Sequence, residues 1–310
     1  MKTADCRLGI GEGEELYTLS RLYSLRYVKD VLEVHGIRLK KSLGQNILFE
    51  RGGVDKLVDA AGIGPEDVVL EVGPGMGHLT RALLERARHV VGIEIDRRML
   101  PILKGLLGGF GNFTLAHADV LKVDLRARFA ELGLTPTCVV ANVPYYISTP
   151  IVEHLAGSGL PFRHVTMTLQ KELAVRYIAE PGTRAYGSVT VAVALWGVPR
   201  IAARISARCF FPRPKIDSVV LRIELHARPP AGISNPAFVQ RVVRAAFSQR
   251  RKMLKNTLRS MAGAGFNVAE ALVAAGIDPA ERAENLSLAD FARLSDRLIE
   301  HASDQLQQSE

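Results

Sequence analysis

The sequence predicts an α/β fold with a mostly parallel sheet, followed by a smaller domain that is all helical. Short apolar, β-branched segments alternate with segments of helical spacing from about residue 64 to residue 225, and this alternation is typical of a parallel sheet covered by helices. The Pro- and Gly-rich stretch 226–237 then precedes a region with helical spacing only. A chain of 310 residues, 47% of them hydrophobic, has room for about two such domains.

The elements of the first domain are predicted from their spacing and composition. Its strands are short and β-branched, whereas its helices repeat apolar residues three or four positions apart. The expected strands are 67–72, 89–95, 112–120, 137–142, 164–170 and 218–225, with another around Ile201. The expected helices are 77–87, 97–107 and 171–180, the last of them stopped by Pro181 and Gly182.

Domain boundaries follow from the same pattern. We expect an N-terminal extension over 1–21, the sheet domain over 22–228, the helical domain over 229–302 and a tail over 303–310.

Composition and the start of the chain indicate a cytoplasmic protein. The first twenty residues contain no apolar signal core and carry four acids, which transit peptides avoid. No apolar run reaches the ~20 residues needed to span a bilayer, so no membrane role is expected. The cysteines, Cys6, Cys138 and Cys209, are far apart and lack paired Cys or His neighbours, so we expect core packing and no metal site.

A glycine-rich loop follows the first strand and opens the first helix. In "EVGPGMGHLT", Gly73, Gly75 and Gly77 allow the backbone to approach a ligand closely, while the helix N-terminus favours negative charge. A dinucleotide-binding fingerprint needs its third glycine one position later, where His78 stands. The spacing therefore disfavours a hydride-transfer enzyme.

Acidic residues end the next two strands. Glu94 follows the first glycine by about 20 residues, where an acid can accept hydrogen bonds from ribose hydroxyls, and Asp119 could accept from an adenine amino group. Each acid taken singly could be a cap or a solvated carboxylate. Together with the loop they mark the carboxyl edge at which open α/β sheets bind ligands. A nucleoside held there without pyrophosphate recognition predicts S-adenosylmethionine and a Rossmann-like methyltransferase.

The fourth strand ends in "NVPYYISTP", which suits methyl transfer to an exocyclic amine of a base. Such an amine is a poor nucleophile because its lone pair is delocalised, and acceptors that hold its hydrogens out of plane would localise that pair. Asn142 offers a side-chain carbonyl, and Pro144 fixes the chain so that a backbone carbonyl can be the second acceptor. Tyr145 can stack on the base. Alone, the segment could be an ordinary strand-to-turn junction with both tyrosines packed at its rim, and packing is the role we assign to Tyr146.

Positive charge gathers in the C-terminal region of a chain whose net charge is +8. Between residues 241 and 259 there are seven Lys or Arg residues and no acid. A solvated helix face normally mixes signs, so the unmixed run favours contact with phosphates. We expect Met253, Leu254, Leu258 and Met261 on the packed side of this run.

Ordered motifs resemble the rRNA adenine-N6,N6-dimethyltransferases, in particular the small-subunit branch that includes the kasugamycin-resistance enzyme of bacteria. The resemblance extends from about Tyr27 to Leu294, with Ile47 and Val143 standing where the family usually has Phe and Leu. The motifs include "LKKSLGQNILFE", "EVGPGMGHLT", "GIEID", "HADVL", "NVPYYISTPI", "FFPRPKIDSVVLRI" and "FSQRRKMLKNTL".

The resemblance implies a class I methyltransferase domain with a mostly parallel seven-stranded sheet, S-adenosylmethionine as cofactor and no metal. The cofactor-binding residues implied are Asn46, Leu48, Gly73, Gly75, Glu94, Asp119 and Asn142. The catalytic residues implied are Asn142, Pro144, Tyr145 and Phe210, with Phe210 closing the other face of the adenine. The residues expected to hold RNA are Arg250, Arg251, Lys252 and Lys255.

The family dimethylates two adjacent adenosines in the 3′-terminal hairpin of 16S rRNA, and we expect this substrate within a 30S assembly intermediate, modified by a monomer. Three alternatives remain open: a 23S rRNA methyltransferase of the macrolide-resistance type, a non-catalytic assembly or transcription factor, and a small-molecule methyltransferase. Intact cofactor and Asn-x-Pro-Tyr residues disfavour the second, and the basic C-terminal region disfavours the third.

Overall fold

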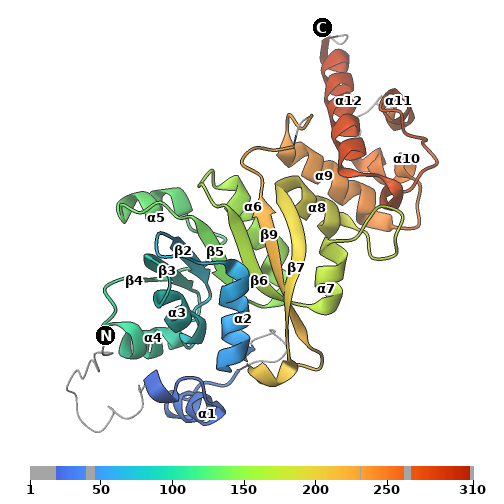
Figure 1. Cartoon of the computed structure of the whole chain (residues 1–310). Helices are drawn as coiled ribbons and strands as arrows, with labels where there is room; N and C mark the ends of the chain where they lie inside the picture. The colour runs from blue at the N-terminus through green and yellow to red at the C-terminus, as the bar shows by residue number, and fades with distance from the viewer. Residues whose placement is uncertain (1–18, 40–45, 231, 262–266, 308–310) are drawn as a thin grey trace. The chain divides into compact units, whose positions relative to one another are not determined.

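The computed structural model describes residues 19–39, 46–230, 232–261 and 267–307 (Figure 1). Most of the predicted N-terminal extension, residues 40–45 within the motif "LKKSLGQNILFE", and Cys6 lie outside the described residues. The chain divides into two compact units, one formed by Met1–Lys171 with Arg200–Leu225 and the other by Glu172–Pro199 with His226–Glu310.

A mixed sheet of seven strands organises the first unit and confirms the predicted fold class. The strands lie in the order β4-β3-β2-β5-β6-β9-β7; β2 to β6 are parallel, and β9 runs antiparallel to β6. Because the order reverses between β2 and β5, the fold opens a crevice beyond the carboxyl ends of these two strands. The bounds are β2 Val68–Val72, β3 His89–Glu94, β4 Phe113–His117, β5 Cys138–Ala141, β6 His164–Gln170, β7 Gly197–Ile205 and β9 Ser218–Leu225.

Burial explains why the two central strands are almost entirely apolar, with Glu71 of β2 as the exception. Every residue of β2 and of β5 is buried, as expected for parallel strands covered on both faces. Cys138 lies in β5 and Cys209 precedes β8, and both are buried free thiols, as predicted.

Six helices accompany the sheet in the described part of the first unit. Helix α2 begins where the Glu50 carboxylate accepts hydrogen bonds from the N–H groups of Gly52 and Gly53, and it ends at Gly62, whose φ of 60° suits glycine. It lies across one face of the sheet, where it contacts β6 and β9 (Figure 1). The helices are α1 Leu25–Val34, α2 Arg51–Ala61, α3 His78–Leu84, α4 Leu100–Leu107, α5 Leu125–Glu131 and α6 Ser148–Gly157.

A second, two-stranded sheet was not predicted. β1 (Ile47–Leu48) pairs antiparallel with β8 (Phe210–Phe211), so that Leu48 lies opposite Phe210. This pairing joins the segment after residue 46 to the loop that precedes β9.

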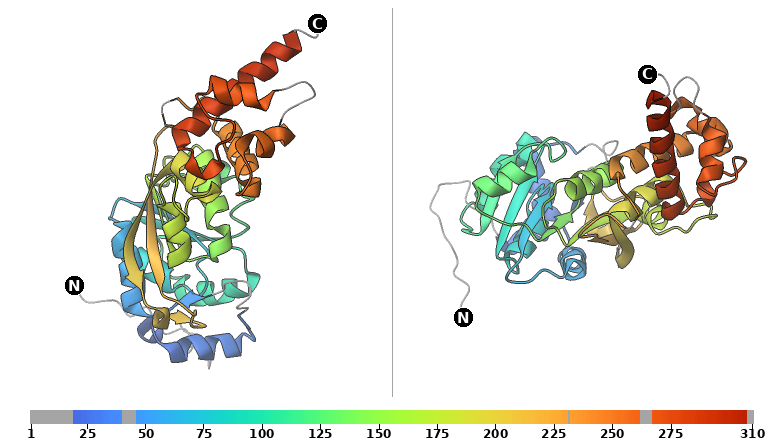
Figure 2. Two further views of the ribbon diagram at one scale, coloured as in Figure 1. Left: turned by 90° about the vertical axis from the view of Figure 1, so that its right-hand side faces the viewer. Right: turned by 90° about the horizontal axis from the view of Figure 1, so that it is seen from above.

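The second unit is helical and has its own core (Figure 2). Its helices are α7 Lys171–Tyr177, α8 Ser188–Trp196, α9 Pro236–Ala246, α10 Leu254–Thr257, α11 Val268–Ala274 and α12 Leu288–Gln307. Asn235 caps helix α9: its side chain accepts from the N–H of Phe238, and Pro236 stands at the first helical position.

The grouping of residues differs from the predicted boundaries in two places. Residues 172–199, assigned to the sheet domain from sequence, belong to the second unit because Tyr186, Val191 and Leu195 share a buried cluster with Val242 of α9 and Phe291 of α12. Helix α12 continues to Gln307, into the range 303–310 that was expected to be a tail. Within the described ranges, every helix is too short or too polar to span a lipid bilayer.

Candidate active site

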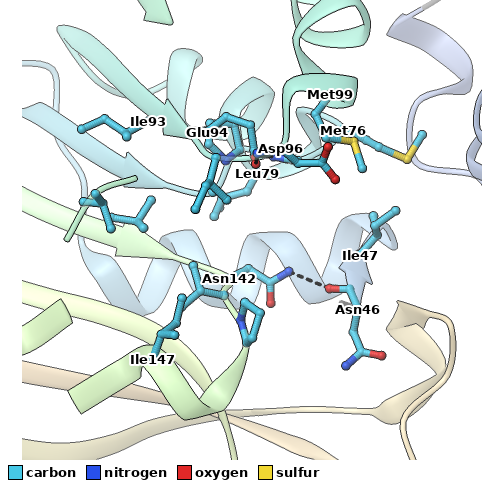
Figure 3. A pocket seen from close by; sticks show the side chains of 18 of the residues that line it. Asn46, Ile47, Met76, Leu79, Ile93, Glu94, Asp96, Met99, Asn142 and Ile147 are labelled. Carbon is cyan, nitrogen blue, oxygen red and sulfur yellow. Dashed lines mark hydrogen bonds between the residues drawn. The ribbon is translucent and has the colours of Figure 1, made fainter. Parts of the chain in front are cut away.

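A cavity of about 450 Å³ lies at the carboxyl edge of the sheet, beside the point where the strand order reverses. Its size lies in the range of small-molecule sites, roughly 300–1,000 Å³. Met76, Leu79, Ile93 and Met99 form apolar parts of its wall (Figure 3). All seven predicted cofactor-binding residues line it: Asn46, Leu48, Gly73, Gly75, Glu94, Asp119 and Asn142.

The loop after β2 turns through glycines with positive φ. The angles are 72° at Gly73, 58° at Gly75 and 84° at Gly77, a region that other residues rarely adopt. A Cβ added to Gly77 would lie 3.0–3.3 Å from three leucines of α4, whereas one added to Gly75 would have no neighbour closer than 3.9 Å. Gly77 therefore allows close helix packing, and Gly75 leaves backbone open to the cavity.

Glu94 ties this loop to the end of β3. Its Oε2 accepts a hydrogen bond from the Gly75 N–H at 2.8 Å, and its Oε1 accepts one from the Asp96 N–H at 2.8 Å. The side chain is buried, and this burial raises the pKa of Glu94 although the backbone donors oppose the shift. Each carboxylate oxygen keeps a second lone pair, so Glu94 can accept two further hydrogen bonds from a ligand.

Asp119 lies two residues beyond β4. Its Oδ1 accepts from the N–H of Leu121 at 3.1 Å, and Lys122 Nζ lies 3.8 Å from its Oδ2. The residue is half-buried and lines the cavity, so it can still accept from an amino group there. Asp96 also lines the cavity and was not predicted from the sequence. Its position, two residues after Glu94 at the end of β3, was the available signal. In the structure Arg98 Nη2 lies 2.6 Å from Asp96 Oδ2.

Asn142 follows the last residue of β5, and both the nitrogen and the oxygen of its side-chain amide form hydrogen bonds. Its Nδ2 donates to the backbone oxygen of Asn46 at 3.1 Å, and its Oδ1 accepts from Thr168 Oγ1 at 2.6 Å. Figure 3 shows Asn142 and Asn46 on one side of the cavity with Glu94 and Asp96 on the other. The amide oxygen has one lone pair left for a ligand.

The turn after Asn142 contributes Pro144, whose carbonyl accepts from the N–H of Ile147 at 3.2 Å. This carbonyl also has a second lone pair. The side chain of Tyr145 lies outside the described part of the chain. The sequence-based assignment of Tyr146 to packing is wrong, because its side chain lines the cavity and is 69% exposed.

Phe210 was predicted to close over a bound base. The structure places it in β8, only 2% exposed and opposite Leu48, and it is not among the described residues that line the cavity. It supports the cavity wall through β1 and packs in the core of the first unit.

Two buried titratable side chains adjoin the loop. Glu71 of β2 is fully buried, and its carboxyl oxygens lack well-formed hydrogen bonds to described residues. Burial, opposed in part by the nearby hydroxyl of Thr80, raises the pKa of Glu71 to about 8. Burial also lowers the pKa of His78, the first residue of α3, to about 4. Both groups are therefore mostly uncharged at neutral pH.

The predicted RNA-contacting residues lie in the second unit. Arg251, Lys252 and Lys255 are exposed. Arg250 instead binds its own chain: its Nη2 donates to the carbonyls of Arg184 and Tyr186 at 3.2 and 3.0 Å, and to Glu284 Oε2 at 3.2 Å. Three of the four residues predicted for the packed side belong there, since Leu254 and Leu258 are fully buried and Met261 packs against the same core. Met253 is half-buried and is not among the described residues of this core.

The fold and the cavity define a class I methyltransferase. A carboxylate with free lone pairs, an exposed loop backbone and an apolar wall of suitable size fit the ribose, the amino acid part and the adenine of S-adenosylmethionine.

Comparisons with known proteins identify the family. Residues 36–300 match the family described as "Ribosomal RNA adenine dimethylase". The chain is 43% identical to a ribosomal RNA small subunit methyltransferase A of Geobacillus thermodenitrificans over 277 residues, 87% of this chain and 94% of that protein. It is 42% identical to the protein of the same name in Streptococcus pneumoniae, covering 90% of this chain and 98% of that one. The chain therefore belongs to the ribosomal RNA adenine dimethylase family. It is an rRNA adenine dimethyltransferase, and its cofactor is S-adenosylmethionine.

Solved structures agree with this membership. A dimethyladenosine transferase from Plasmodium falciparum superposes with a TM-score of 0.66 at 27% identity, covering 81% of this chain and 96% of that one. The 23S rRNA methyltransferase ErmE superposes with a TM-score of 0.57 at 26% identity, covering 81% and 98%.

Proposed function

We propose that this enzyme dimethylates the N6 amines of two adjacent adenosines in the 3′-terminal hairpin of 16S rRNA. Its substrate is a 30S assembly intermediate, and the enzyme acts in the cytoplasm as a monomer. Two relatives named for the small ribosomal subunit share 42–43% of their residues with the chain over nearly their full length, against 26% for ErmE. This difference favours the small subunit over the large one.

The observation that carries the mechanism is the oriented amide of Asn142 at the cavity. S-adenosylmethionine supplies an electrophilic methyl group when bound. Glu94 accepts hydrogen bonds from the ribose hydroxyls, Asp119 accepts from the adenine amino group, and the loop from Gly73 to Gly75 offers its backbone to the remainder.

Asn142 Oδ1 and the carbonyl of Pro144 hold the hydrogens of the target amine. Their lone pairs draw those hydrogens out of the plane of the base and localise the nitrogen lone pair towards the methyl donor. No general base is needed, because the aminium product loses its proton readily to water. Tyr145 stacks on the base, and Phe210 reaches its other face only if β8 shifts, since this side chain is buried in the structure.

Dimethylation places a further demand on the same turn. After the first transfer the amine keeps one hydrogen, so a methyl group must fit where the other hydrogen was. Val143 is buried, and Pro144 lines the cavity without an N–H. This apolar wall accommodates the first methyl group while one acceptor still holds the remaining hydrogen.

The extruded base requires that the surrounding RNA be held by its phosphates, because unstacking costs a few kcal/mol. The exposed cations Arg251, Lys252 and Lys255 form no ion pair with a described residue and supply phosphate contacts. Arg250 contributes by fixing the loops around them.

The substrate is tested by mass spectrometry of RNA after incubation with labelled cofactor. Unmethylated 30S subunits and naked 23S rRNA are offered separately, and the 3′-terminal hairpin is isolated from the first. Two dimethyladenosines in the hairpin and no label in 23S rRNA are the expected result. Label in 23S rRNA alone would contradict the proposal and show that the enzyme is a 23S rRNA methyltransferase of the macrolide-resistance type.

A further inference from the structure

The strand next to Asn142 carries a buried hydroxyl aimed at its amide. Ala141, the last residue of β5, lies opposite Met167 of β6, so the parallel register continues to Asn142 and Thr168. Thr168 is fully buried, and its Oγ1 donates to Asn142 Oδ1 at 2.6 Å. The hydroxyl thus lies behind the amide that lines the cavity.

Two partners together fix the orientation of this amide. The backbone oxygen of Asn46 can only accept, so the nitrogen end of Asn142 must face it. The hydroxyl of Thr168 then donates to the oxygen end. If the amide flipped, its N–H groups would point at the amine of the substrate and two donors would face each other. Holding the oxygen in place before the substrate arrives is the preorganisation that accelerates a reaction.

We propose that Thr168 is a positioning residue for methyl transfer, acting through Asn142 and never touching the substrate. The proposal rests on the function proposed above for Asn142. Without the hydroxyl, the Asn142 amide keeps only its hydrogen bond to the Asn46 carbonyl. Binding of the substrate must then also fix the orientation of the amide. If the free energy of this one hydrogen bond is lost from the transition state, the rate of methylation falls roughly three- to tenfold.

The test compares single-turnover rates and the affinity for S-adenosylhomocysteine in a set of variants. Thr168→Val removes only the hydroxyl and keeps the shape, Thr168→Ser keeps the hydroxyl, and both are also made in an Asn142→Ala background. The expected result is a three- to tenfold lower rate for Thr168→Val, a near wild-type rate for Thr168→Ser, and no further loss from Thr168→Val when Asn142 is already Ala.

Two outcomes overturn the proposal: equal rates for wild type and Thr168→Val, or the same loss in both backgrounds, which would mean that Thr168 acts through packing. The melting temperature of each variant separates misfolding from mispositioning, and Thr168→Ser still reports on the hydroxyl if Thr168→Val does not fold. Rates are taken on whichever RNA the wild-type enzyme methylates, so failure of the 16S proposal is seen independently.

A second inference concerns charge on the first unit. Five exposed cations lie in β7 and between β7 and β9: Arg200, Arg204, Arg208, Arg213 and Lys215. Residues 200–216 contain no acid, and the exposed Asp217 comes directly after them. None of the five forms an ion pair with a described residue. We call them the β7–β9 basic surface.

The part of this surface around β8 adjoins the cavity wall through the small sheet, whereas Arg200 lies near Glu224, at the other edge of the main sheet. Arg213 and Lys215 follow β8, which pairs with Ile47 and Leu48 of the cavity wall. We infer that Arg208, Arg213 and Lys215 of the β7–β9 basic surface bind phosphates of the RNA strand that flanks the target base. Exposed cations make the local electrostatic potential more positive, which lowers the energy of a bound polyanion, and their contacts with phosphates release counterions from the RNA.

Charge reversal tests this surface against a matched control. The triple variant Arg208→Glu, Arg213→Glu and Lys215→Glu is compared with Lys29→Glu, Lys104→Glu and Arg126→Glu, three exposed cations elsewhere on the same unit. Binding is measured with naked RNA carrying the hairpin, at several salt concentrations. The first variant should bind more weakly and its salt slope should fall by about 2, while the control changes less. Equal losses in both variants, or a loss seen with 30S particles but not with naked RNA, would contradict an RNA-phosphate surface.

Discussion

The N–H of Gly75 donates to Glu94 Oε2 at 2.8 Å, so one carboxylate fixes the glycine-rich loop and also faces the cavity. The loop cannot take its ligand-binding shape independently of the residue proposed to hold the ribose. Cofactor affinity should therefore depend on Glu94 more steeply than on any surface acid.

Replacing Glu94 by Ala should weaken cofactor binding on the order of 100-fold. The change removes two acceptors for ribose hydroxyls and releases the N–H groups of Gly75 and Asp96. Calorimetry with S-adenosylhomocysteine measures the effect. The control Glu131→Ala removes an exposed acid of α5 and should bind normally; equal affinities in the two variants would remove Glu94 from the site.

Replacing Glu71 by Gln should stabilise the protein above about pH 5 and increasingly up to pH 8. The folded pKa of Glu71, about 8, lies above its ordinary value of 4.5, so folding retains a proton that the unfolded chain releases. Wild-type stability from this group is complete below pH 4.5 and declines until the folded group ionises near pH 8. The gain of the variant should reach a few kcal/mol at pH 8. Melting temperatures of both proteins are measured across this pH range. A difference between them that does not change with pH would show that Glu71 is not held protonated.

Replacing Arg250 by Met should destabilise the second unit by about 1–2 kcal/mol, because three acceptors on two loops lose their shared donor. Arg251→Met, one residue along, changes an exposed side chain and should stay within about 0.5 kcal/mol of wild type. Denaturant unfolding compares them. If the two variants are equally stable, Arg250 belongs with the RNA contacts.

Reversing Arg251, Lys252 and Lys255 to Glu should weaken binding to 30S subunits and lower the salt slope by about 2, without changing the melting temperature. Arg250 is left intact so that loss of structure is not mistaken for loss of contact. Lys29→Glu, Lys104→Glu and Arg126→Glu again supply the control. An unchanged affinity and slope would mean that the run from 241 to 259 is an ordinary solvated surface.

Periodicity predicted the sheet well because parallel strands buried on both faces are short, mainly apolar runs, as in β5 and, apart from Glu71, in β2. The strand ends predicted the position of the cavity. Glu94 and Asn142 stand at the carboxyl ends of parallel strands, and these ends lie at one edge of the sheet.

Contacts between distant segments could not be predicted in this way. Thr168 reads as an ordinary strand residue until the register brings it beside Asn142. Arg250 lies in a basic run and gives no sign that its partners are 34 to 66 positions away. Residues 172–199 follow a strand in sequence, yet their apolar side chains are buried with α9 and α12.

The rate of N6 methylation by Asn142→Ala measures what the oriented amide contributes to methyl transfer. Single-turnover dimethylation of unmethylated 30S subunits is measured by mass spectrometry, with S-adenosylhomocysteine affinity and melting temperature recorded for the same preparation. We expect a fall of at least about 100-fold in a folded protein at saturating cofactor, since Asn142 also lines the cofactor cavity. Near wild-type dimethylation by this variant would contradict this role of the amide.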